Sequence, residues 1–219
     1  MFKNIGSSWL LLLLTVGATY LIMPFSIKVL GEGAYGTFLL ITSTTNYLSL
    51  LMMGVPMATV RHLAKLSAEG KPEEVNRAIG SCLVLFLGMS VTSLLAGGLL
   101  YLFFDQTYAL SGALRQEARL AFALTVLWAS AGFVGQLLNA ILAAHRDFVV
   151  RSAILTASLL LRLGLTFGLL SLKPSIVWLA AVQVIVLVFE GVTMWAVIQR
   201  RHPGTRISLR DFDRGLIRR

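Results

Sequence analysis

Two charged side chains, Arg162 and Glu190, lie inside long apolar runs, where each could bind an ion or an oppositely charged ligand. If those runs cross a membrane, each charge costs about 2.5 to 3.5 kcal/mol on insertion scales, so something must offset it. An Arg162–Glu190 ion pair could do so, and it would then only lock two helices together. Alternatively, the side chains line a water-filled cavity that receives an anionic or polyhydroxylated ligand, or they snorkel to an interface.

Four carboxamides occupy the same kind of apolar surroundings and could hydrogen-bond across a helix interface or within a cavity. They are Asn46, Gln136, Asn139 and Gln183. Gln136 and Asn139 are three residues apart, which places them on one face of a helix. Each amide alone favours a role in helix packing. Together with Arg162 and Glu190 they predict a polar interior shared by several helices, and we expect these six residues to line a substrate pathway.

Residues that could catalyse a reaction are missing from the sequence. His62, His145 and His202 are isolated, with no His, Cys or carboxylate nearby at metal-ligand spacing. No phosphate loop of the GxxxxGK(S/T) type occurs, so we expect no nucleotide hydrolysis. The single cysteine, Cys82, excludes an intrachain disulfide. We therefore predict no enzyme activity, no metal and no cofactor.

The elements that must position the polar residues are long apolar helices. Of the 219 residues, 57% are hydrophobic and only 13% are charged, about half the charge that soluble domains carry. The charges delimit six runs of 21 to 28 residues, the last two interrupted by Arg162 and Glu190, and each is long enough to span a bilayer. The sequence predicts an all-α membrane protein, a six-transmembrane-helix bundle. Its expected spans are 9–29, 37–61, 78–104, 119–144, 149–171 and 176–199.

Basic residues are distributed unequally between the two sides of this bundle. Fourteen Lys and Arg residues fall on the side of the N-terminus and four on the other side. Cytoplasmic loops carry the excess of basic residues, so both termini are expected in the cytoplasm. The net charge of +9 thus reflects topology, and we expect no nucleic-acid partner.

Residues 1–199 are expected to form the six-helix transmembrane lobe, and residues 200–219 a basic cytoplasmic tail or a linker to a further lobe. Arginines recur at every fourth position from 206 to 218, opposite an apolar stripe of Leu209, Phe212 and Leu216. This pattern is typical of an amphipathic helix lying on anionic lipid headgroups. An ordinary juxtamembrane linker is the alternative.

Prolines and glycines predict where helices bend or approach closely. Pro24 and Pro56 should kink the first and second spans. Small faces at Gly97–Gly98, at Gly132 with Gly135, and at Gly164 with Gly168 would allow close packing of neighbouring helices. Trp128 is an exception among the tryptophans, because it does not fall near a predicted end of a span, where tryptophan is usually found.

Three stretches carry a resemblance to a known family. The loop LGEGAYGTF at 30–38 resembles the LG-x-x-x-YG-x-F signature of bacterial polysaccharide (O-antigen type) flippases, of the multidrug/oligosaccharidyl-lipid/polysaccharide exporter superfamily. GVPMATVRHLA at 54–64 looks like the family's end of span two, and LNAILAAHRDFVVRSAI at 138–154 like its turn between spans four and five. With six expected spans, the chain is similar to the N-terminal lobe only.

The resemblance implies a function and a set of partners. It implies transport of a lipid-linked oligosaccharide from the inner to the outer leaflet of the bacterial inner membrane, by alternating access and within a larger two-lobe transporter. Expected partners are the lipid-linked oligosaccharide, membrane lipids, and a second lobe or homodimer partner. Since family members have twelve to fourteen spans, the chain is expected to be a fragment, a truncated product or a half-transporter that must pair. The alternative is a non-transporting membrane scaffold or assembly partner, or an inactive flippase fragment.

Overall fold

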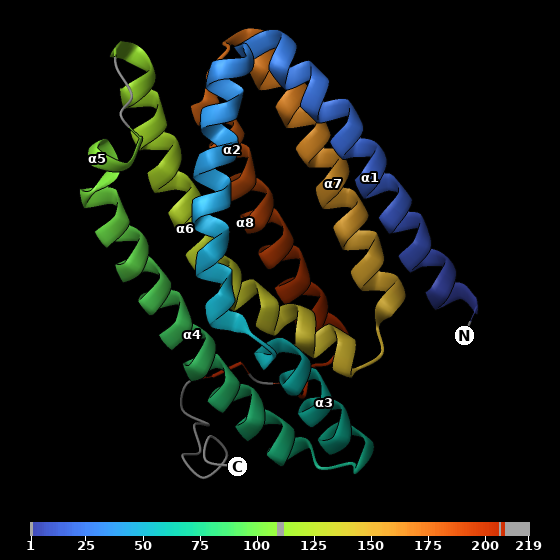
Figure 1. The fold of residues 1–219 in the computed structure, drawn as a ribbon. Coiled ribbons are helices and arrows are strands. Elements are labelled where there is room, and N and C mark those ends of the chain that lie inside the picture. The colour runs from blue at the N-terminus through green and yellow to red at the C-terminus, as the bar shows by residue number, and fades with distance from the viewer. Residues whose placement is uncertain (1, 109–111, 206, 209–219) are drawn as a thin grey trace.

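The computed structural model describes residues 2–108, 112–205 and 207–208, and this part of the chain is helical throughout, without strands (Figure 1). The elements follow one another as α1 (Phe2–Leu30), α2 (Glu32–Asn46), the 3-10 helix η1 (Tyr47–Met52), α3 (Val55–Ala68), α4 (Pro72–Leu102), α5 (Phe104–Tyr108), α6 (Gly112–Ala144), α7 (Phe148–Leu172) and α8 (Ile176–Arg201).

Five helices are long and apolar enough to cross a membrane, and a bent pair supplies a sixth when its two pieces are counted as one span. The five are Leu11–Leu30, Pro72–Leu102, Leu114–Ala144, Phe148–Leu172 and Ile176–Arg201. The sixth joins Glu32–Met52 to Val55–Ala68 with a bend of 41°. The predicted all-α, six-span architecture is therefore confirmed, with the second span broken into two pieces. Such a chain is a multi-pass membrane protein.

The break in the second span falls before Pro56, the residue expected to cause it. Gly54 takes a left-handed conformation with φ of 77°, which glycine adopts without strain, and it ends the helical path after η1. Pro56 instead lies in the first turn of α3, where its missing N–H is not needed. At Pro24, where a kink was also predicted, α1 continues unbroken.

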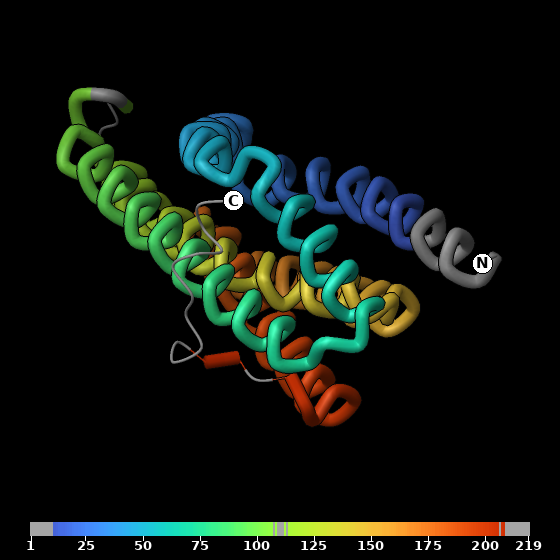
Figure 2. Tube along the Cα trace, turned by 90° about the horizontal axis from the view of Figure 1, so that it is seen from below, coloured from blue at the N-terminus to red at the C-terminus, as the bar shows by residue number. Residues whose placement is uncertain are grey.

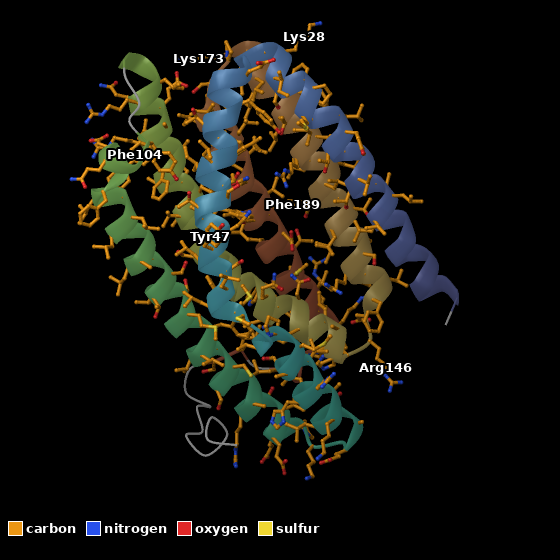
Figure 3. The ribbon with its side chains drawn as sticks, in the orientation of Figure 1. Lys28, Tyr47, Phe104, Arg146, Lys173 and Phe189 are labelled. Atoms are coloured by element: carbon orange, nitrogen blue, oxygen red, sulfur yellow. The ribbon has the colours of Figure 1, made fainter. Side chains whose placement is uncertain are left out.

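The helices form a bundle in which α1 and α7 pack together on one side and α4 lies on the opposite side (Figures 1 and 2). Helix α6 crosses the middle and packs against both α4 and α8. Lys28 and Lys173 lie at one end of the bundle and Arg146 at the other (Figure 3). The ends at which these three residues lie agree with spans that run alternately in opposite directions across the membrane, as predicted.

Two apolar clusters hold the bundle together, one toward each end. The cluster near Arg146 joins α3, α4, α6, α7 and α8 through side chains such as Leu63, Phe86 and Ile141. The cluster near Lys173 joins α2, α5, α6, α7 and α8 around Phe122. Many large apolar side chains on the outside of the helices are exposed, as a lipid-facing surface requires.

Only one of the predicted small faces makes a tight helix crossing. A Cβ atom added to Gly97 on α4 would lie 2.9 Å from Cγ2 of Val126 on α6, so this glycine allows the two helices to approach. An added Cβ at Gly135 would make an ordinary contact, 3.7 Å from Leu187. Gly164 and Gly168 have open space around them, so their spacing serves no close packing within the described chain.

Helix α8 ends at Arg201, and the chain then turns back toward the start of α4. The Thr205 amide donates to the His202 carbonyl at 2.8 Å, and the Asn76 side chain donates to the Gly204 carbonyl at 3.0 Å. The predicted amphipathic helix of the basic tail lies almost entirely outside the described residues.

Candidate functional site

Two adjoining cavities of about 310 Å³ each lie between the helices. The first is bounded by α1, α2, α6, α7 and α8, and the second by η1, α6, α7 and α8. Trp128, Arg162 and Gln183 line both of them. We call these three side chains the junction, because they stand where the cavities meet.

All six residues that the sequence singled out reach these cavities. Asn46 lines the first cavity, and Gln136, Asn139 and Glu190 line the second. Arg162 and Gln183 belong to both. Gln136 and Asn139 share one face of α6, as their spacing predicted. The polar residues therefore gather in one interior region contributed by several helices.

Arg162 lies near the middle of α7 and is open to the cavities. It lies fourteen residues after the start of α7 and ten before its end, so about 15 to 21 Å of helix separates it from either end. Its side chain forms no ion pair or hydrogen bond with another described residue. Tyr35 on α2 lines the first cavity together with it. A guanidinium in this position can bind an anion that enters the cavity.

The ion pair between Arg162 and Glu190, one of the alternatives raised by the sequence, does not form. Glu190 instead accepts a hydrogen bond of 3.5 Å from the Asn139 amide. Asn139 in turn accepts a hydrogen bond of 2.9 Å from Nε of Arg151. Arg151 is thus the positively charged neighbour of the Glu190 carboxylate, and Asn139 bridges the two side chains.

Sequence reasoning missed Arg151, which it placed with the basic residues of the turn before α7. A signal for it was present. Arg151 and Arg162 are eleven residues apart, close to three full turns, so both project from the same face of α7. Because one arginine on this face reached the polar interior, the other was a candidate to do so too.

Threonine hydroxyls add hydrogen-bond acceptors to the first cavity. Thr15, Thr19 and Thr42 line it, and each donates its proton to a carbonyl of its own helix, at 2.8 to 3.0 Å. Their oxygen lone pairs remain available to a ligand. The first cavity therefore combines one cation, Arg162, with several neutral acceptors.

Two of the three histidines expected to be isolated, His145 and His202, are in contact at the Arg146 end. Their rings lie with centroids 4.0 Å apart and are tilted by 35°. Nε2 of His202 lies 2.7 Å from the Asp147 carboxylate, which Arg201 also approaches at 3.4 Å. Among the described residues, no group of three or more His, Cys, Asp or Glu side chains could hold a metal ion. The contacts fasten the end of α8 to the turn between α6 and α7.

The fold and the cavities define a class, a multi-pass helical membrane protein whose polar interior surrounds an arginine that has no acidic partner among the described residues. No family model, curated protein or solved structure matches the chain.

Proposed function

We propose that this chain is one lobe of a flippase that moves a lipid-linked oligosaccharide, a polysaccharide or O-antigen repeat unit, from the inner to the outer leaflet by alternating access. The observation that carries the proposal is Arg162, an arginine at mid-helix, open to a cavity and without an acidic partner among the described residues. A scaffold has no use for such a charge, whereas an anionic substrate would offset its cost while bound.

The chemistry of the cavity walls fits a phosphorylated glycan. Arginine binds phosphate oxygens through two parallel hydrogen bonds, which suits the diphosphate of a lipid carrier. Neutral acceptors and carboxamides on the same walls suit sugar hydroxyls. The transport step makes and breaks no covalent bond, so the proposal includes no enzyme activity, metal or cofactor.

The size of the cavities supports a second lobe. Ligand sites usually enclose about 300 to 1,000 Å³, and each cavity here is at the lower limit of that range. This space suits a phosphate group and a first sugar better than a whole repeat unit. We propose that a second lobe, or a second copy of the chain, completes the walls, as in transporters whose site lies between repeats.

We also propose an orientation. The Arg146 end, where basic residues concentrate, faces the cytoplasm of a bacterium, and the Lys28 and Lys173 end faces the periplasm. Reporter fusions after Lys173 and at the C-terminus test this arrangement. Periplasmic activity is expected for the first and cytoplasmic activity for the second, and the reverse result contradicts the orientation.

Arg162→Met tests the function directly, with Arg162→Lys as a variant that keeps the charge. The chain, alone and as a tandem of two copies, is expressed in bacteria lacking their own polysaccharide flippase, and surface glycan is measured. Export is expected from wild type, reduced export from Arg162→Lys, and none from Arg162→Met at equal membrane insertion. Full export by Arg162→Met contradicts the proposal, and no export by wild type in either form excludes a second copy of the chain as the other lobe.

A further inference from the structure

The junction joins one residue from each of three helices: Trp128 from α6, Arg162 from α7 and Gln183 from α8. Arg162 is the anion site of the proposed function. Trp128 and Gln183 adjoin that site and carry no charge. Their own surroundings indicate what they bind.

Gln183 is a buried carboxamide that has no hydrogen-bond partner among the described residues. It is only 7% exposed, and its Oε1 atom is fully buried and accepts no hydrogen bond from this part of the chain. Its amide nitrogen donates to no other described residue either. Leaving a buried polar group unpaired costs about 1 to 3 kcal/mol, and such groups are rare in proteins. A ligand carrying both a donor and an acceptor, such as a hydroxyl or an acetamido group, would satisfy both ends of this amide.

Trp128 stands at the midpoint of α6, sixteen residues from either end. Tryptophan in membrane proteins is usually found at the headgroup layer, so a half-buried indole on a polar cavity at this depth is unusual. The indole N–H donates to no described residue. The face of an indole ring is electron-rich and attracts the C–H groups on one face of a pyranose ring.

We propose that Trp128 and Gln183 form a sugar subsite next to the anion site of Arg162, and that this subsite selects the first sugar of the ligand. Trp128 stacks on the sugar ring, and the Gln183 amide pairs with a hydroxyl or acetamido group. Arg162, between the same two cavities, holds the adjoining phosphate. This inference rests on the proposed function and adds to it the group that is recognised.

Two matched lipids separate the sugar from the phosphate. Undecaprenyl phosphoglucose and methyl undecaprenyl phosphate each carry one phosphodiester charge and differ in the sugar alone. Their affinities are measured for the full chain in lipid nanodiscs. Gln183→Met keeps the side-chain volume and removes the amide, and Arg162→Met removes the anion site.

Wild type is expected to prefer the glucosyl lipid. Gln183→Met should weaken binding of that lipid about 5- to 30-fold, the effect of one or two lost hydrogen bonds, and change binding of the methyl lipid less than 2-fold. Trp128→Leu should act in the same way, with Trp128→Phe retaining part of the preference. Arg162→Met should weaken both lipids alike.

The melting temperature of unliganded Gln183→Met distinguishes a ligand-binding role of Gln183 from a structural one, because the two roles predict changes in opposite directions. It should equal or exceed that of wild type, because the variant removes an unsatisfied buried group. A lower melting temperature means that Gln183 has a structural partner and overturns the subsite.

The lipid measurements also distinguish failure of the subsite from failure of the function. Equal affinity of wild type for both lipids, lost in Arg162→Met, keeps the anion site and overturns the sugar subsite. An effect of Gln183→Met on both lipids, or on neither, overturns it as well. Wild type that binds neither lipid overturns the proposed function and the subsite together.

Discussion

Arg151 on α7 donates a hydrogen bond of 2.9 Å to the side-chain oxygen of Asn139 on α6. The side-chain nitrogen of Asn139 donates a hydrogen bond of 3.5 Å to Glu190 on α8, so three helices are joined through one amide. Helices α6 and α7 make little other contact with each other, since α7 packs mainly on α1 and α8. The polar chain is therefore a major connection between α6 and α7.

Removing Arg151 should destabilise the protein, whereas removing Arg162 should not. Arg151→Met leaves Asn139 and Glu190 without their positive neighbour and should lower the free energy of unfolding by about 1 to 3 kcal/mol. Arg162→Met removes a guanidinium that has no hydrogen bond to any other described residue, so stability should stay equal or rise. Thermal unfolding of both variants in one detergent measures the difference. Equal destabilisation would show that the two arginines have similar roles.

The crossing of α4 and α6 should not tolerate even one added methyl group. Gly97→Ala places a carbon against Val126, and such overpacking costs about 1 to 3 kcal/mol. Gly164→Ala on α7 is the matched control, because open space surrounds it and alanine favours a helix by about 0.8 to 1 kcal/mol. Val126→Ala should restore part of the stability lost in Gly97→Ala. Equal melting temperatures of the two glycine variants would contradict the close approach of α4 and α6.

Replacing Arg146 by glycine should stabilise the turn between α6 and α7. Arg146 is the only non-glycine residue of the described chain with a positive φ, at 60°, and the Asp147 amide after it donates to the Leu142 carbonyl at 3.0 Å. A left-handed conformation costs a residue with a Cβ about 1 to 2 kcal/mol, which glycine avoids. Arg146→Gly should therefore raise the melting temperature. Arg146→Ala removes the same charge without relieving the strain, so a similar gain in both would assign the effect to charge.

The connection between α4 and α6 should lose stability in acid through Asp105. Nε of Arg115 donates to the Asp105 carboxylate at 2.8 Å, and this hydrogen bond holds the pKa of Asp105 below its ordinary value of 3.8. A lowered pKa means that the contact stabilises the fold fully above 3.8 and is lost as the pH falls through the lower, folded value. The contact is solvent-exposed, so the effect is modest.

The measurement compares the melting temperatures of wild type and Asp105→Asn from pH 7 to pH 3. Wild type should be the more stable at pH 7, and the difference should shrink below about pH 4, near the ordinary carboxyl pKa. Glu73→Gln is the control, because Glu73 is exposed and forms no ion pair with another described residue. A difference that is constant over this range would contradict the contact with Arg115.

Some features could be predicted because they depend on neighbours along the chain. A run of 20 or more apolar residues can only be satisfied by a helix in lipid, so the spans and their order followed from the positions of the charges. The shared face of Gln136 and Asn139 followed from helical periodicity alone. The break in the second span was predicted at Pro56 but lies at Gly54. Whether a glycine takes a left-handed conformation depends on the direction of the helix that follows it, and that direction is set by tertiary packing.

The sequence by itself determined that Arg162 and Glu190 lie inside apolar spans. Only the tertiary structure decided that they do not pair, since the rotation of each helix about its axis is set by packing against its neighbours. The same packing brings Arg151 to Asn139, places the rings of His145 and His202 4.0 Å apart, and leaves Oε1 of Gln183 without a hydrogen-bond partner among the described residues. These contacts join residues from different helices, and their geometry depends on all the helices at once.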